Sequence, residues 1–172
     1  KEGRRRRVLA VPDLGVLPKK LLEEILERNH VVLNEKTVIL ESYKRSATCL
    51  ETILKHSVVE DEVSVLSEAE YEKYPLVLPL AECFLEKDIR LTYEEYHACI
   101  GAAENYAKAN ENYQFNLTKI KGFHNIQITC FEGKWCMISK NRAPAIHFVI
   151  HHPKLRYALE NMVLPIRDDE IE

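Results

Sequence analysis

The residue types in this sequence that most readily do chemistry gather in its last third. His147, His151 and His152 belong to one mostly apolar run, and His124 lies upstream of it. On a β-strand, His147 and His151 would share a face but lie about 13 Å apart, too far to bind one metal ion. Because a metal site would need ligands from elsewhere in the chain, we expect ordinary strand-edge histidines and no metal site.

A polar segment, Ser139-Lys140-Asn141-Arg142, follows a predicted strand in the same region. Its two cations could hold a phosphate or a carboxylate through charge-assisted hydrogen bonds, although the same residues also suit a solvated loop. A Ser–Lys catalytic pair is not expected, because adjacent strand residues point to opposite faces. The candidate ligand-binding residues all come from the last third of the chain: Ser139, Lys140, Arg142, His147, His124 and Trp135.

The five cysteines are an odd number without the close spacing of a zinc site, which favours reduced, mostly buried thiols. Cys130 and Cys136 flank a predicted Glu132-Gly133 turn. A two-residue loop would pair Cys130 with Trp135 and put the two sulfur atoms on opposite faces, whereas a three-residue loop would place them opposite each other. We therefore expect free thiols, with a cross-strand disulfide as the alternative.

Composition argues against several other classes of function. The five glycines do not cluster into a phosphate-binding or dinucleotide-binding loop, and the carboxylates form no persuasive acid–base pair. A net charge of −3 over 172 residues argues against a nucleic-acid-binding surface over the whole domain. No apolar run is long enough for a membrane span and no signal peptide opens the chain, so we expect a cytoplasmic protein without a cofactor.

Apolar periodicity predicts mostly helices in the first two thirds of the chain and consecutive strands after them. Helices are expected to begin at residues 18, 34, 93 and 154, with two shorter ones in the region bounded by capping boxes at Ser67 and Thr92. Strands are expected at 8–11, 63–66, 113–120, 126–130, 135–139 and 145–151. The expected fold class is α+β: helices packed on an antiparallel or mixed β-sheet, with a C-terminal β-hairpin, a third strand and a terminal helix.

We expect a single domain over residues 8–166, helix-rich at 8–110 and sheet-rich at 111–166. Residues 1–7 contain four consecutive arginines and are interpreted as the end of a basic linker, and residues 167–172 as a frayed acidic tail. The sequence does not begin with methionine, so we expect an excised domain. The linker would be simply solvated, or would connect to a nucleic-acid-binding module outside the sequence.

Two runs of the last third resemble the C-terminal effector region of certain bacterial transcriptional regulators. One is the strand–turn–strand run from Phe123 to Lys140 (FHNIQITCFEGKWCMISK), and the other is Ala143 to Leu155 (APAIHFVIHHPKL) with Ala158-Leu-Glu-Asn161 after it. Residues 34–54 fit the resemblance more loosely. In those regulators a helix-turn-helix domain of the small phage-repressor type precedes the effector region. The resemblance implies a cytoplasmic regulator whose DNA-binding module lies outside this chain, and it carries no known site residues.

The expected function is therefore that of a ligand-sensing effector domain, a dimerising one, or one that does both. Its partners would be an unknown small-molecule effector and a second copy of the chain, since operators are usually two-fold symmetric, with DNA reached only through the external module. Two alternatives stay open. One is a small hydrolase-type enzyme acting on a phosphorylated or nucleotide substrate through the histidine and Ser–Lys segments. The other is a protein-interaction module with an exposed apolar patch.

Overall fold

The fold is α+β, as the sequence predicts, and its sheet is mixed. A computed structural model describes residues 3–80, 88–118 and 123–171, the side chains of 164–171 excepted. Its strands are β1 (Arg4–Leu9), β2 (Val58–Ser64), β3 (Tyr113–Thr118), β4 (Ile126–Phe131), β5 (Trp135–Lys140) and β6 (Ile146–Ile150). Its helices are the short 3-10 turn η1 (Leu14–Val16) and α1 (Lys19–Arg28), α2 (Leu33–His56), α3 (Glu68–Lys73), α4 (Tyr93–Ala109) and α5 (Pro153–Ile171).

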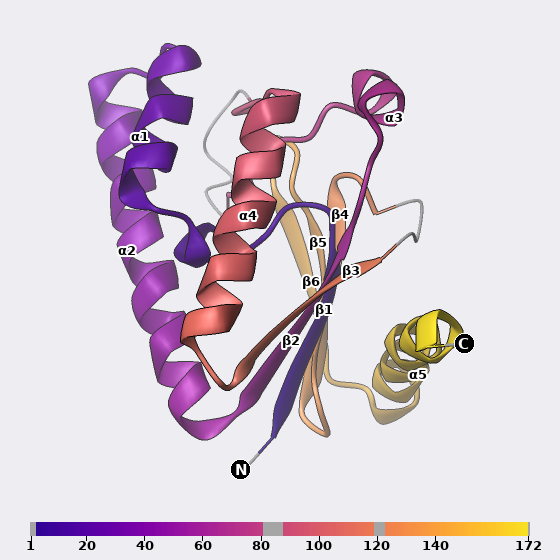
Figure 1. The fold of residues 1–172 in the computed structure, drawn as a ribbon. Coiled ribbons are helices and arrows are strands. Elements are labelled where there is room, and N and C mark those ends of the chain that lie inside the picture. The colour runs from indigo at the N-terminus through magenta and orange to yellow at the C-terminus, as the bar shows by residue number, and fades with distance from the viewer. Residues whose placement is uncertain (1–2, 81–87, 119–122, 172) are drawn as a thin grey trace.

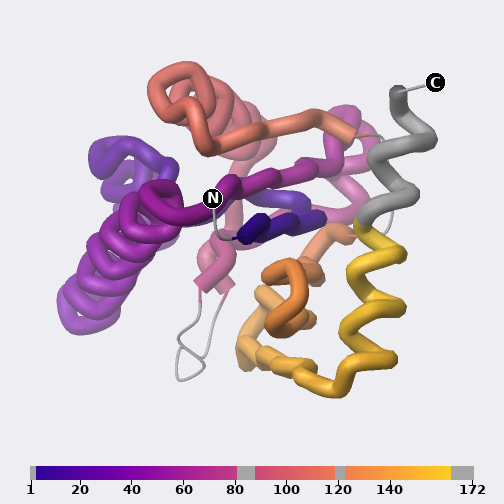
Figure 2. Tube along the Cα trace, turned by 90° about the horizontal axis from the view of Figure 1, so that it is seen from below, coloured from indigo at the N-terminus to yellow at the C-terminus, as the bar shows by residue number. Residues whose placement is uncertain are grey.

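The sheet has the strand order β3-β2-β1-β4-β5-β6 (Figure 1). Strands β1, β2 and β3 run parallel to one another, and β4, β5 and β6 are added antiparallel. Helices α1, α2 and α4 lie on one side of the sheet and α5 lies on the other (Figures 1 and 2). The strands from both halves of the sequence therefore form one sheet, with β1 near its centre.

The arginine run is not a linker, because Arg4 to Arg7 form most of the strand β1. The strand pairs in register with the acidic strand β2, where Arg6 lies opposite Glu60 and Arg7 opposite Asp61. Cross-strand pairs of opposite charge stabilise a sheet in place of the usual apolar alternation. Strand β2 accordingly covers Val58–Ser64 and not the predicted 63–66.

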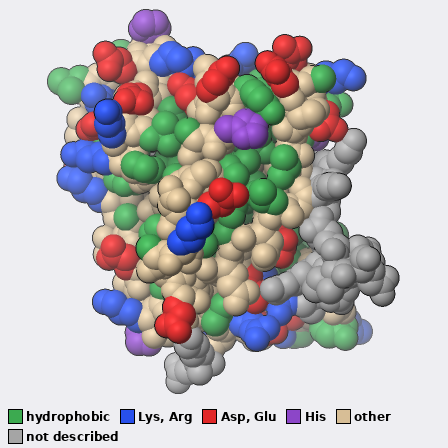
Figure 3. Space-filling model, in the orientation of Figure 1, with side chains coloured by type: hydrophobic (Ala, Val, Ile, Leu, Met, Phe, Trp, Pro, Cys, Tyr) green, Lys and Arg blue, Asp and Glu red, His purple; other side chains and the backbone are tan. Residues whose placement is uncertain are grey.

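Alternation along β1 sends its arginines to the two faces of the sheet. Arg4 and Arg6 lie on the α5 side, where both are paired with Glu60, Arg6 at 2.9 Å. Arg5 and Arg7 lie on the α2 side and are both buried. On the face seen in Figure 3, acidic and basic side chains of the described residues are interspersed.

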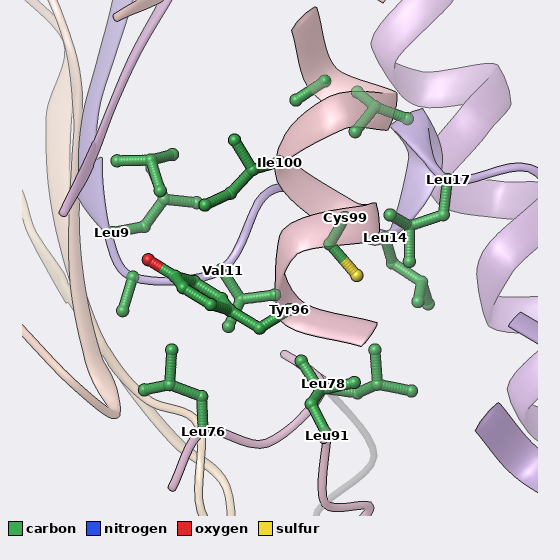
Figure 4. Packing of buried hydrophobic residues seen from close by; sticks show 14 of the residues in the cluster. Leu9, Val11, Leu14, Leu17, Leu76, Leu78, Leu91, Tyr96, Cys99 and Ile100 are labelled. Carbon is green, nitrogen blue, oxygen red and sulfur yellow. The ribbon is translucent and has the colours of Figure 1, made fainter. Parts of the chain in front are cut away.

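The main core fills the space between the sheet and helices α1, α2 and α4. Tyr96 of α4 is fully buried, and Figure 4 shows it and Ile100 pointing toward Leu9 of β1. Its hydroxyl donates to the carbonyl of Ser64 at 2.7 Å, which ties α4 to the end of β2. Each apolar side chain buried in this way contributes roughly 2 kcal/mol to folding. The predicted apolar stripe of α4, and its capping box at Thr92, are confirmed.

Helix α5 covers the other face over a smaller cluster formed by Val8, Ile128, Cys130, Cys136 and Val163. The interpretation of residues 167–172 as a frayed tail is wrong for 167–171, since α5 continues to Ile171. The sequence after Pro165 has no glycine to end the helix. Among the described helices, none combines the length and hydrophobicity that a membrane span needs.

The hairpin β4–β5 has the three-residue loop. Cys130 lies directly opposite Cys136, and Gly133 takes the left-handed φ of 75° that the turn requires. The two sulfur atoms are 2.7 Å apart and both residues are free thiols, as expected. Burial is the main reason that the pKa values of both thiols are raised above the ordinary value. Cys83 lies outside the described residues.

The region of the two prolines differs in part from the prediction of two short helices. Helix α3 begins at the predicted capping box of Ser67 and is the first of the two. After it, the chain is extended, and Val77 forms an isolated antiparallel bridge with Arg90. Residues 81–87 lie outside the described residues.

Candidate functional site

Arg7 is the centre of a buried ion network on the α2 side of the sheet. Its Nε and Nη2 donate to the two oxygens of Asp61 at 2.7 and 2.5 Å, and its Nη1 donates to Asp13 at 2.6 Å. Tyr113 also donates to Asp61, at 2.9 Å. Burial alone would lower the pKa of Arg7, but the two carboxylates outweigh it and raise that pKa. Arg7 is thus fully compensated by protein groups.

Asp13 is held in place by the turn that follows β1. Its second oxygen accepts the backbone N–H of Gly15 at 2.8 Å and caps the helix η1. Burial raises the pKa of Asp13, but the charges of Arg7 and Arg5 outweigh it, so the pKa lies below its ordinary value. Gly15 is required here because a Cβ would lie 2.8 Å from the backbone of Ser46 in α2. The turn therefore packs directly on α2.

The surroundings of Arg5 differ from those of Arg7, because they leave two of its donors unpaired. Arg5 is 8% exposed, yet its Nε and Nη2 have no hydrogen-bond partner among the described residues. Burial is the largest influence on its pKa and lowers it, as does the charge of Arg7, while Asp61 and Asp13 raise it only partly. The hydroxyl of Thr129 on β4 is likewise buried without a partner. A buried charge that lacks a partner is costly, so Arg5 is the least satisfied cation in this part of the structure.

Arg5 and Thr129 both line a cavity of about 440 Å³. One side of the cavity is the sheet, with residues from β1, β4, β5 and β6, and the other side includes Ser46, Cys49 and Ile53 of α2. This volume is within the usual range of small-molecule sites. The cavity thus lies beside two residues with unsatisfied polar atoms, and neighbouring protein atoms cover those atoms.

Two of the six predicted binding residues, Trp135 and His147, line this cavity. Ser139 is fully buried behind His147, and its hydroxyl lies 2.8 Å from Nδ1 of that ring. The pair occupies facing positions on β5 and β6. Ser139 therefore fixes the orientation of a cavity-lining imidazole rather than contacting a ligand itself.

The structure places the other three predicted residues elsewhere. Lys140 is exposed and alternates with Ser139, so it lies on the other face of β5. Arg142 forms a 3.1 Å ion pair with Asp88, outside the cavity lining. His124 stacks on Tyr74 with ring centroids 4.4 Å apart. No three His, Cys, Asp or Glu side chains of the described residues come together as a metal site.

Sequence reasoning missed Arg5, Arg7, Asp13 and Thr129. The arginine run looks like a solvated linker because it has none of the apolar alternation by which strands are recognised. A usable signal was present in charge: the basic segment 4–7 and the acidic segment 60–62 both adjoin valines and have complementary charges. Such complementarity suggests paired strands, but it does not say which arginine stays unpaired.

Comparison of the chain with protein-family models, curated proteins and solved structures finds no match.

Proposed function

We propose that this chain is the ligand-sensing effector domain of a bacterial transcriptional regulator, and that its effector occupies the cavity beside Arg5. The observation that carries the proposal is Arg5, a buried residue that lines a cavity of about 440 Å³ and whose guanidinium has two unpaired donors. A group that lowers stability is retained when it serves binding. The ligand would supply the partner that the protein itself does not.

The position of the cavity supports a regulatory role. The segments that resemble regulator effector regions form β4, β5 and β6, and these strands contribute Trp135, Met137 and His147 to the cavity. The opposite wall belongs to α2, which is a separate element from the sheet. A ligand that binds one arrangement of α2 more tightly than another would shift the population toward it. A DNA-binding module outside this chain would read that shift, in the cytoplasm.

The dimerising part of the proposal rests on the edge of the sheet. Strand β6 is the last strand in the sheet order, and its Phe148 and Val149 are 64% and 54% exposed. Tyr157 on the neighbouring helix α5 is exposed as well. An edge strand with apolar side chains readily pairs with a second copy of itself. We propose this edge as the dimer interface.

The hydrolase alternative has one observation in its favour, the 2.8 Å contact between Ser139 and His147. However, Ser139 has no exposed surface and does not line the cavity. A nucleophile must lie within reach of its substrate. The contact is therefore better explained as support for the His147 ring.

Native mass spectrometry of the purified chain tests the proposed function, with the same sample analysed again after denaturation. We expect a dimer that carries a co-purified small molecule, and we expect the small molecule to be lost in an Arg5→Met variant. A monomer that carries nothing, and that retains nothing from a bacterial metabolite extract, would contradict both parts of the proposal.

A further inference from the structure

We propose that the ligand of this cavity is a monocarboxylate with an apolar body. This inference rests on the proposed function and names the chemical class of the effector. It comes from three observations that are independent of the regulator resemblance: the edge of Arg5 that is unpaired, the balance of charge around it, and the character of the remaining lining.

The unpaired donors of Arg5 are Nε and Nη2, which form one planar edge of the guanidinium. Two parallel N–H groups on such an edge match the two oxygens of a carboxylate. Arg7 shows the same arrangement in the neighbouring network, where its Nε and Nη2 bind the two oxygens of Asp61. On Arg5 the same edge has no hydrogen-bond partner, and neighbouring protein atoms cover it. A ligand carboxylate would bind this edge as Asp61 binds that of Arg7 once the Arg5 side chain turns it toward the cavity.

The charge around the cavity favours a single negative charge. Arg5, Arg7, Lys134 and Asp13 line it, and Arg7 is paired with both Asp13 and Asp61, of which Asp61 lies behind the lining. The sum over these five groups is +1, which one carboxylate would neutralise. A phosphate dianion would instead leave a net negative charge close to the two aspartates, which opposes binding in a poorly solvated site. Carboxylates are therefore favoured over phosphate monoesters.

The rest of the lining is mostly apolar and selects the body of the ligand. It includes Leu14, Ile53, Leu80, Phe131, Trp135 and Met137. The rings of Phe131 and Trp135 lie 5.8 Å apart, so a flat or extended hydrocarbon group can pack against both. A carboxylate group fills only a small part of a cavity of about 440 Å³. An aliphatic or aromatic carboxylic acid would use both kinds of surface.

The chain provides its own reporter, because Trp135 is its only tryptophan and lines the cavity. We would follow Trp135 fluorescence during titration with a series of carboxylates, from phenylacetate and 3-phenylpropionate to decanoate. Each acid is paired with its primary amide and with a phosphate monoester of similar length. Charge-assisted hydrogen bonds predict that at least one acid binds about tenfold or more tightly than its amide.

Variants of β1 separate the role of Arg5 from a general effect of charge. Arg5→Met should reduce the affinity for the acid to that for the amide, and Arg5→Lys should recover only part of the loss because it lacks the planar pair of donors. Arg4→Met is the matched control, since Arg4 lies on the same strand but on the opposite face. It should leave the affinity unchanged.

The possible outcomes distinguish this inference from the proposed function. If amides or phosphate monoesters bind as tightly as the acids, or if native mass spectrometry finds a co-purified molecule that is not a carboxylic acid, the ligand class is wrong and the sensor role stands. If no probe changes Trp135 fluorescence and nothing co-purifies, the proposed function itself fails. An acid affinity that Arg5→Met leaves intact would also overturn the inference.

Discussion

Arg5 and Arg7 extend from the same face of one strand, yet the protein satisfies only one of them. Arg7 has a bidentate carboxylate and a second acidic partner, whereas Arg5 has unpaired donors beside a cavity. The difference arises because Asp61 lies opposite Arg7 on β2, while Val59 lies opposite Arg5. Substitution of the two residues should therefore have opposite effects on the free energy of unfolding.

Replacing each arginine by methionine should change stability in opposite directions. Arg7→Met leaves Asp61 buried without its cation and should lower the free energy of unfolding by roughly 3–5 kcal/mol. Arg5→Met removes an unpaired buried charge and should raise it by about 1 kcal/mol. Urea unfolding followed by circular dichroism measures both. A large loss of stability in Arg5→Met would indicate a structural role for Arg5.

Because Asp13 is ion-paired with Arg7, the free energy of unfolding should depend on pH. Because its folded-state pKa is lowered, Asp13 stabilises the fold above its unfolded pKa of about 3.9, and this contribution is lost as the pH falls through the folded value. The difference in unfolding free energy between the wild type and Asp13→Asn should therefore be largest near neutral pH and shrink below about pH 4. Glu24→Gln, on the exposed face of α1, controls for net charge. A difference that grows toward acid pH would contradict the assignment.

At the scale of elements, the cavity depends on how closely η1 and α2 approach the sheet. Gly15 permits that approach, because its missing side chain leaves room for the backbone of Ser46 and Ala47. The turn then holds Asp13 beside Arg7, and α2 forms the wall of the cavity. The close packing of η1 on α2 thus helps to set the position of this wall.

Two glycine substitutions test this contact. In Gly15→Ala, the new Cβ would lie 2.8 Å from Ser46 backbone, which forces a shift and should cost roughly 1–3 kcal/mol. Gly101→Ala is the matched control, since a Cβ there meets nothing within 4 Å and the residue lies inside α4. It should stabilise the helix by up to about 1 kcal/mol. Equal effects in urea unfolding would contradict the proposed packing of η1 on α2.

Elements with regular apolar periodicity were predictable from the sequence. Helix α4 begins at the predicted residue, and the hairpin strands β4 and β5 and the third strand β6 lie where they were predicted, within one residue at each end. Strand β1 was not predictable, because charge pairing with β2 replaces apolar alternation there. Trp135 and His147 could be found because they lie on predictable strands. Arg5 could not, since its importance depends on a partner strand more than fifty residues away.

At the scale of the whole molecule, the sheet carries both of the surfaces that we propose to be functional. Its α2 face holds the cavity, and its β6 edge exposes Phe148 and Val149. The two regions are linked by His147, which lines the cavity from β6 itself. A ligand that contacts His147 would therefore touch the strand that we propose as the dimer interface.

A charge at this edge should break the proposed dimer. Phe148→Asp would place a carboxylate on β6 and should give a monomer by light scattering after size-exclusion chromatography. Leu33→Asp is the matched control, because Leu33 is 77% exposed at the start of α2, away from β6. It should leave the dimer intact. If the Phe148→Asp protein stays dimeric, the dimer interface does not lie at the β6 edge.

The most direct measurement follows the Arg5 guanidinium by nuclear magnetic resonance. Its Nε–Hε signal can be identified by its loss in Arg5→Met and then followed during titration with the acid that gives the strongest Trp135 response. We predict that the Arg5 signal shifts as the carboxylate accepts its hydrogen bond, that the Arg7 signal stays in place because Asp61 already occupies it, and that the matched amide moves neither. An Arg5 signal that does not move at saturating acid, or that moves equally with the amide, would contradict the role assigned to Arg5.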